Sequence, residues 1–271
     1  MILKRIAIGA LMMSLWSYRG FILGSVKREF QSKYQNSLLG AAWMVINPLA
    51  MILIYTVIFS QVMQARLPGV DSTFSYGIFL CAGILTWGLF AEITGRAQNM
   101  FLEHANLIKK LNFPRLCLPA TVVLNALLNF SIVFALFLLF LLVSGNFPGW
   151  VFIALFPLLL ILVLFAIGLG ITLGVLNVFF RDVGQFFGVF IQFWFWLTPI
   201  VYAANTLPEY IRPWLALNPM ASLMVAFQAI LVMGQWPNWQ TLWPITLLSL
   251  LLCATGFRLF CNQSSEMADE L

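Results

Sequence analysis

Long apolar stretches separated by short polar segments dominate this chain. Six tracts are nearly free of Asp, Glu, Lys and Arg, and they cover residues 38–63, 74–95, 116–144, 150–180, 183–204 and 241–261. Each is about as long as the ~20 residues that a helix needs to cross a hydrocarbon layer ~30 Å thick. The pattern therefore predicts an all-α integral membrane protein, a single domain over 1–271 with six transmembrane helices.

An amphipathic segment over residues 22–36 precedes the first apolar tract. One helical arc would carry Ile22, Leu23, Val26, Phe30 and Tyr34, and the opposite arc Lys27, Arg28, Gln31 and Gln35. Lys33 falls on the apolar arc, so its long side chain would have to reach back to water. This arrangement predicts a helix lying in the headgroup plane. A plain topology anchor explains the basic residues equally well.

Two further segments are apolar but too short to cross. The stretch from Phe101 to Lys110 predicts a short amphipathic helix, closed by Asn112-Phe113-Pro114, that could dock into a soluble partner. Residues 205–240 hold four prolines and the apolar piece 220–233, which predicts re-entrant helices before the last span. The chain thus divides into an interface region (1–37), five spans (38–204), an external re-entrant region (205–240) and the last span with its tail (241–271).

The basic residues predict the orientation of these segments. With six spans, 12 of the 14 Lys and Arg fall on one side, and only Arg66 and Arg212 on the other. Five or seven spans would scatter these charges. The bias predicts a multi-pass protein of the cytoplasmic membrane with both termini cytoplasmic. Lys4 and Arg5 precede an apolar run that imitates a signal peptide, but no small-x-small cleavage site follows, so we expect an uncleaved surface segment.

Composition narrows the functional classes. Hydrophobic residues make up 62% of the chain and charged residues 8%, far from the usage of soluble domains. The net charge of +5 is spread along loops, which suits lipid headgroups and topology better than nucleic acid. The four cysteines lack metal-ligand spacing and are expected to be reduced; they are Cys81, Cys117, Cys253 and Cys261.

The polar residues do not form a catalytic constellation. His104 is the single histidine, and Glu103 beside it is expected to be a solvated carboxylate. Glu92 and Arg96 lie four residues apart and can pair on one helix face, which favours a helix-end pair at the interface over catalysis. No G-x-x-x-x-G-K-[ST] phosphate loop occurs. We therefore predict a non-enzyme without catalytic or metal residues, and the charge-free span centres argue against an ion-coupled transporter.

Aromatic, glycine and proline residues mark the spans. The first, second and fifth tracts are rich in aromatic side chains, which either pack and face lipid or line a conduit on whose faces sugar rings stack. Packing is the more common role for a single residue, and both roles stay open for the fifth tract. Gly170 and Gly174 form a small-x-x-x-small step that permits close helix approach. Pro48 and Pro199 predict kinks in the first and fifth spans.

Specific stretches carry a family resemblance that extends over nearly the whole chain. They are NVFFRDVGQFFGVFIQFWFWLTPIVY over 177–202, Leu207-Pro208-Glu209, Asn218-Pro219-Met220 and KREFQSKYQNSLLGAAWMVINP over 27–48. Together they resemble the permease of type-2 ABC exporters, in the O-antigen/lipopolysaccharide and teichoic-acid polysaccharide group. The resemblance implies a homodimeric pore driven by two copies of a separate ABC ATPase, which would bind the ATP and magnesium, so that this chain itself needs no cofactor.

The resemblance also implies roles for individual residues. Lys27 and Arg28 would contact the diphosphate of a polyprenyl-linked glycan where it enters beside the interface helix. The ATPase-coupling segment would present Phe101, Glu103, His104, Lys109 and Lys110. Sugar-stacking aromatics of the channel would be Tyr55, Phe59, Trp87, Phe90, Phe193, Trp194 and Trp196.

These features predict a permease subunit that exports a polyprenyl-diphosphate-linked, O-antigen-like polysaccharide in contact with membrane lipids. A drug or antibiotic exporter of the same architecture is the nearest alternative, since an apolar aromatic pore also suits lipophiles. A membrane-embedded glycan-modifying enzyme would need acidic or histidine groups that the sequence lacks. A passive channel would differ by working without an ATPase.

Overall fold

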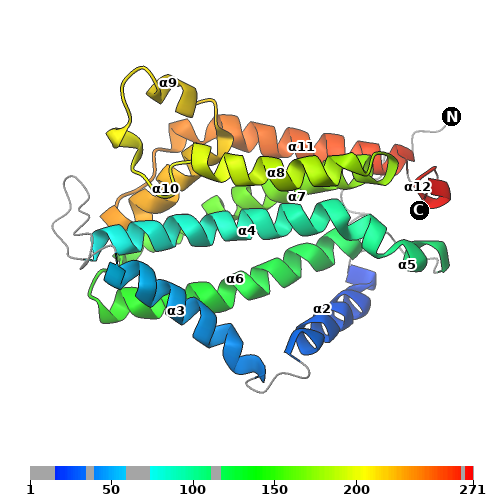
Figure 1. Cartoon of the computed structure of the whole chain (residues 1–271), viewed down its shortest axis with the longest axis horizontal. Helices are drawn as coiled ribbons and strands as arrows, with labels where there is room; N and C mark the ends of the chain where they lie inside the picture. The colour runs from blue at the N-terminus through cyan, green and yellow to red at the C-terminus, as the bar shows by residue number, and fades with distance from the viewer. Residues whose placement is uncertain (1–15, 35–39, 59–73, 111–116, 264–265, 271) are drawn as a thin grey trace.

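A computed structural model describes residues 16–34, 40–58, 74–110, 117–263 and 266–270, and over these ranges it contains helices and no strand (Figure 1). Four helical segments are long and apolar enough to cross a membrane: α4 (Ser75–Glu103), α6 (Cys117–Val143), α7 (Leu155–Phe179) with the 3₁₀ turn Gly149–Ala154 before it, and α11 (Trp243–Gln263) with the turn Trp239–Thr241 before it. The predicted all-α membrane fold is confirmed at this level.

Two of the six predicted spans form shorter helices. α3 (Trp43–Val57) has 15 residues and α8 (Asp182–Leu197) has 16, so each extends about 22–24 Å at ~1.5 Å per residue. Pro48 lies inside α3 as predicted. The kink predicted at Pro199 is wrong, because α8 ends at Leu197 and Thr198 is extended, the backbone state favoured before proline. The predicted surface segment at 6–15 and residues 59–63 of the first tract lie outside the described residues.

Small residues let α7 pack closely between α4 and α11. A Cβ atom added at Gly174 would lie 2.7 Å from the backbone oxygen of Ala97 in α4, and one at Gly168 would lie 2.7 Å from the backbone nitrogen of Cys253 in α11. Gly256 faces Thr172 from the α11 side in the same way. The close approach predicted from the glycine step is confirmed, and it makes α4, α7 and α11 a tightly packed block.

The shorter elements gather at the two ends of the bundle (Figure 1). α2 (Arg19–Tyr34), α5 (Ala105–Lys110) and α12 (Glu266–Glu270) lie at one end, and α12 packs against α5. α9 (Arg212–Leu215) and α10 (Pro219–Met233) lie at the other end. The three segments predicted to share a side of the membrane therefore do share an end of the molecule.

α10 corresponds to the apolar piece predicted between the last two spans. The Asn218 side chain accepts a hydrogen bond from the backbone N–H of Met220 and caps its first turn, and Gly234 ends it in the left-handed region with φ 61°. Its inner face is buried against α4 and α7, with Leu223 and Ile230 fully covered. The helix is thus part of the protein core at that end.

Candidate functional site

A charged cluster lies where α2, α4 and α6 meet. Arg96 of α4 forms an ion pair with Glu29 of α2 and a second pair, 3.5 Å long, with Glu92 one turn earlier in α4. The predicted pairing of Glu92 with Arg96 is confirmed. Its predicted place at a helix end is wrong, because α4 continues for two turns beyond Arg96.

Two asparagines of α6 complete this cluster. Asn125 donates a hydrogen bond to the second oxygen of the Glu29 carboxylate, and Asn129 donates one of 2.6 Å to Glu92. Asn125 and Asn129 lie four residues apart on one side of α6, where Asn125 meets α2 and Asn129 meets α4. The Glu29 carboxylate joins α2 to two helices at once, because one oxygen meets Arg96 and the other meets Asn125.

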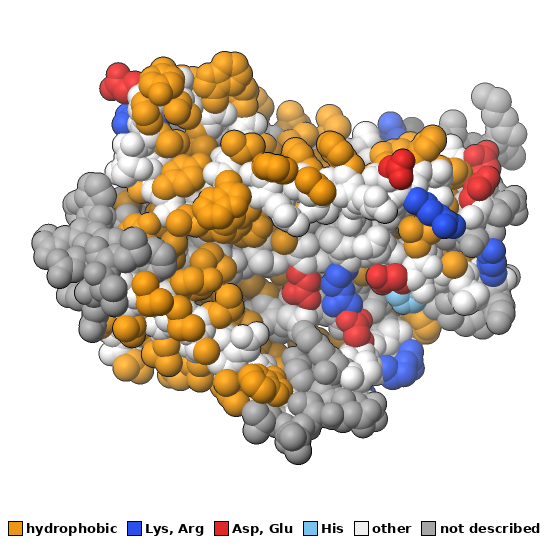
Figure 2. Space-filling view, viewed as in Figure 1, with side chains coloured by type: hydrophobic (Ala, Val, Ile, Leu, Met, Phe, Trp, Pro, Cys, Tyr) orange, Lys and Arg blue, Asp and Glu red, His pale blue; other side chains and the backbone are white. Residues whose placement is uncertain are grey.

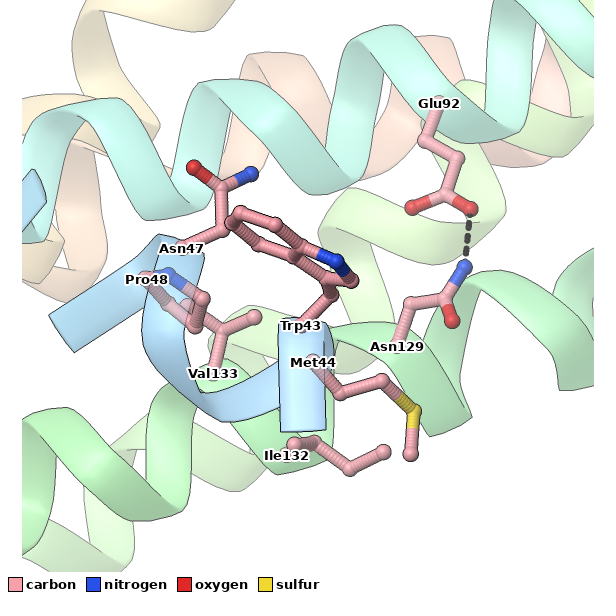
Figure 3. A pocket seen from close by; sticks show the side chains of 8 residues that line it. All are labelled: Trp43, Met44, Asn47, Pro48, Glu92, Asn129, Ile132 and Val133. Carbon is pink, nitrogen blue, oxygen red and sulfur yellow. Dashed lines mark hydrogen bonds between the residues drawn. The ribbon is translucent and has the colours of Figure 1, made fainter. Parts of the chain in front are cut away.

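A cavity of about 490 Å³ opens between α3, α4 and α6 beside this cluster. Figure 3 shows the Trp43 ring, the Asn47 amide and the Glu92 carboxylate around it, with the hydrogen bond from Asn129 to Glu92 at one edge. Aliphatic and thioether groups from Met44, Pro48, Ile132 and Val133 form the remaining wall. The cavity therefore combines one aromatic face, one carboxylate and two amides.

A second cavity of about 550 Å³ lies behind α2, against α4 and α6. Its polar lining includes Arg28, Arg96 and His104, together with the hydroxyls of Ser25, Ser32 and Thr121, and the carboxylates of Glu29 and Glu103. Arg28 reaches it from α2, where its guanidinium also donates to Ser25. Lys27 is exposed and is not among the lining residues. Of the two predicted diphosphate contacts, Arg28 is the one beside a cavity.

Sequence reasoning missed Glu29, Asn47, Asn125 and Asn129. The two arcs assigned from the sequence left Glu29 out, whereas in the structure Ile22 and Val26 are buried and Glu29 accepts a hydrogen bond from Asn125 of α6. Leu23, which was predicted to share the apolar arc with Ile22 and Val26, is exposed. Two asparagines spaced by four in an otherwise apolar helix are a usable signal, since polar groups inside a membrane need partners.

The predicted channel aromatics fall into two groups. Trp87 and Phe90 of α4 are buried and pack against Trp194 of α8, with ring centroids 6.0 Å and 5.2 Å from the Trp194 ring. Phe165 of α7 stacks on Phe90 at 5.6 Å. The Trp194 indole N–H donates to Asn218, which ties this aromatic core to the start of α10. Trp87 and Phe90 are therefore buried within the protomer, whereas Trp194 is half-buried and also lines a cavity of about 480 Å³ beside α9 and α10.

The remaining predicted aromatics face outward or lie elsewhere. Phe193 and Trp196 of α8 are each 66% exposed, and Tyr55 of α3 is half-buried. Phe59 lies outside the described residues. Hydrophobic side chains cover much of the face drawn in Figure 2, whereas charged side chains gather toward the end with α2, α5 and α12. α8 thus carries an exposed aromatic surface.

The predicted coupling segment differs in structure from the single short helix expected. α4 runs on to Glu103, the helix breaks at His104, and α5 begins at Ala105. Phe101 is fully buried and stacks on Phe260 of α11 at 5.4 Å, so its side chain faces the core. Glu103, His104 and Lys109 are exposed, and Lys110 ends α5.

Asn177, the first residue of the stretch 177–202, connects three helices. Its amide donates to the Gln98 carbonyl and to the Asn99 side chain in α4, and its oxygen accepts from the backbone N–H of Gly184 in α8. A Cβ at Gly184 would lie 2.8 Å from that oxygen. One side chain thus fixes the α7–α8 turn against α4.

The described part of the chain holds no group of three or more His, Cys, Asp or Glu side chains that could bind a metal. Cys81, Cys117 and Cys253 form no disulfide with another described residue. The interactions that the structure shows at the site are hydrogen bonds, ion pairs and aromatic contacts.

The helices long and apolar enough to cross a membrane are typical of an integral membrane protein, and comparison with known families identifies its class. Residues 22–232 match the family described as ABC-2 type transporter. The chain belongs to this family, and it is therefore a transport subunit rather than an enzyme.

Individual relatives resemble the chain over almost its whole length. It is 31% identical over 264 residues, 96% of this chain and 99% of the relative, to the O-antigen export system permease protein RfbA of Myxococcus xanthus. It is 31% identical over 245 residues, 90% of this chain and 92% of the relative, to the protein of the same name from Klebsiella pneumoniae. The polysialic acid transport protein KpsM of Escherichia coli is 20% identical over 244 residues, 89% of this chain and 92% of KpsM.

Proposed function

We propose that this chain is the permease subunit of an ATP-driven exporter that moves a polyprenyl-diphosphate-linked, O-antigen-like polysaccharide across the cytoplasmic membrane. The observation that carries the proposal is the end-to-end similarity, at 31% identity, to an O-antigen export permease. A drug exporter of the same architecture is the alternative, and nothing in the described part of the structure specifically favours it.

Six spans with both termini in the cytoplasm fit this function. In this arrangement α3 and α8 are the first and fifth spans. The shared end of α2, α5 and α12 supports the orientation, because the basic residues that predict a cytoplasmic side cluster in and beside these segments.

The lipid diphosphate would meet the protein beside α2. Arg28 and Arg96 line the cavity behind this helix together with three hydroxyl groups, all of which can donate to phosphate oxygens. Glu29 and Glu103 line the same cavity, so the site is close to electroneutral and would hold phosphate by directed hydrogen bonds more than by net charge. Lys27 would contribute from the exposed face of α2.

Two copies of the chain would enclose the translocation path, and two copies of an ABC ATPase would power it. Phe193 and Trp196 give α8 an exposed aromatic face that can meet the second copy or the glycan. Glu103, His104, Lys109 and Lys110 would contact the ATPase, while buried Phe101 anchors that segment to α11. ATP and magnesium would be bound by the ATPase, so the chain needs no cofactor of its own.

The proposal is tested by depleting the protein from its bacterium and measuring polyprenyl-linked glycan on each face of the cytoplasmic membrane. We expect accumulation on the cytoplasmic face, reversed by the intact gene. Normal surface glycan without a trapped intermediate would contradict the proposal and bring the drug-exporter alternative forward.

A further inference from the structure

The cavity between α3, α4 and α6 contains polar groups that the rest of the described chain leaves unused. The Glu92 oxygen Oε1 serves both Asn129 and Arg96, and Oε2 accepts no hydrogen bond from a described residue. Within the described ranges the Trp43 indole N–H and the Asn47 amide are likewise unpaired, although both line the cavity (Figure 3). The cavity therefore offers both donors and acceptors to a ligand.

The chemistry of this lining discriminates between ligands. An anion would be repelled by the Glu92 carboxylate, and a lipid tail would leave the polar groups without partners, which is costly away from water. A cation gains less here than beside a lone carboxylate, because Arg96 already lies 3.5 Å from Glu92. A neutral ligand rich in hydroxyl groups satisfies the donors and acceptors together.

The aromatic wall completes the match. The C–H face of a sugar ring packs on an aromatic face while its hydroxyls point sideways, and the half-exposed Trp43 ring supplies such a face next to Asn47 and Glu92. The volume of about 490 Å³ falls within the roughly 300–1,000 Å³ typical of small-ligand sites.

We propose that Trp43, Asn47, Glu92 and Asn129 form a binding subsite for one uncharged sugar unit of the exported glycan. The inference rests on the proposed function and adds a site to it, because none of these four residues belongs to the predicted channel aromatics. In this subsite Trp43 stacks on the ring, Glu92 Oε2 accepts from a hydroxyl, and the two amides fix its orientation.

The subsite is tested by photo-crosslinking in cells that make the glycan and carry the intact permease and its ATPase. p-Benzoylphenylalanine is placed at Val133, which lines the cavity, and in a matched variant at Leu139, which is 57% exposed farther along the same helix. We expect a glycan adduct, detected with a glycan antibody, at least fivefold stronger at Val133 than at Leu139. Phospholipid adducts alone at Val133 would overturn the subsite.

Further substitutions in the permease that carries p-benzoylphenylalanine at position 133 sharpen this test. Trp43→Ala should lower the glycan adduct at least fivefold, and Trp43→Phe should keep most of it because an aromatic ring is retained. Trp150→Ala is the control, since Trp150 is 85% exposed in the turn before α7. An adduct unchanged by Trp43→Ala would overturn the stacking role.

The two proposals fail in distinguishable ways. Export by the intact permease without a glycan adduct at Val133 overturns the subsite and leaves the proposed function standing. Absence of glycan export by the intact permease with its ATPase overturns the proposed function, and the glycan subsite with it.

Discussion

The two flanks of α4 are built differently. Toward α7 the helices meet almost backbone to backbone, through Gly170 and Gly174 against Ala97. Toward α2, helix α4 meets its neighbour through the ion pair between Arg96 and Glu29, and two cavities of about 490 and 550 Å³ remain on the side of α2, α3 and α6. Close packing resists deformation, whereas ion pairs and cavities allow rearrangement at modest cost. The comparison indicates a rigid block toward α7 and a more deformable flank, which we call the polar flank, toward α2.

The strongest test of this contrast is Gly174→Leu. The new side chain would collide with the Ala97 carbonyl. We therefore expect the free energy of unfolding to fall by about 3 kcal/mol or more, with little folded protein left. Fluorescence-detected size-exclusion chromatography after detergent extraction measures the folded fraction. Gly95→Leu is the matched control in α4, because a Cβ there meets nothing within 4 Å. Equal yields of the two variants would show that the block is not tightly packed.

An effect of similar size is expected from emptying the aromatic core. Trp87→Ala should lower the free energy of unfolding by about 3–5 kcal/mol, since Trp87 is only 8% exposed and packs on Trp194 and Phe90. Trp196→Ala, at a position 66% exposed, should leave thermal stability of the protomer nearly unchanged. Thermal aggregation temperatures in detergent compare the two. Similar values for both variants would contradict the division into buried and outward aromatics.

On the polar flank, Arg96→Ala should lower the free energy of unfolding by about 1–2 kcal/mol. The value is below the cost of breaking a fully buried pair because the Arg96 and Glu29 side chains are 32% and 42% exposed. Limited proteolysis of α2 should become faster, since the ion pair holds that helix. The exchange Glu29→Arg with Arg96→Glu restores opposite charges and should recover much of the protection. If α2 is cleaved as fast in the exchange variant as in Arg96→Ala, the ion pair is not what holds α2 in place.

The smallest effect on stability is expected at the exposed end of α5. Lys109→Glu with Lys110→Glu should leave the folded protein within about 0.5 kcal/mol of the original, because Lys109 is exposed and Lys110 ends the helix. Co-purification of the ATPase should nevertheless fall at least fivefold if this segment couples the subunits. Glu209→Lys, a charge reversal at the opposite end, serves as the control. Normal assembly and export in the double variant would remove the coupling assignment.

Hydropathy and small-residue spacing predicted the rigid block well. Apolar tracts located α4, α6, α7 and α11, and the step from Gly170 to Gly174 predicted the close approach, because in both cases the property is local in sequence. The same reasoning placed α10 between the last two spans. Family resemblance pointed to the stretch whose first residue, Asn177, joins three helices.

The polar flank was less predictable because its partners are far apart in the chain. Glu29 meets Arg96 and Asn125 across 67 and 96 positions, separations that no periodicity reveals. The sequence also did not show which aromatic residues are buried. Composition cannot tell buried Trp87 from exposed Trp196, because hydrophobicity is equal and only the helix contacts differ.

The capped helix α10 also bears on how the protein is made. Its inner face packs on α4, which leaves the ribosome more than a hundred residues earlier. At about 5–20 residues per second, roughly ten seconds of synthesis separate the two helices. During that interval the surface of α4 around Gly83, which Gln228 and Ile200 later cover, faces lipid or the insertion machinery. The nascent permease therefore completes the packing around α4 only near the end of translation, and truncated chains would lack that cover.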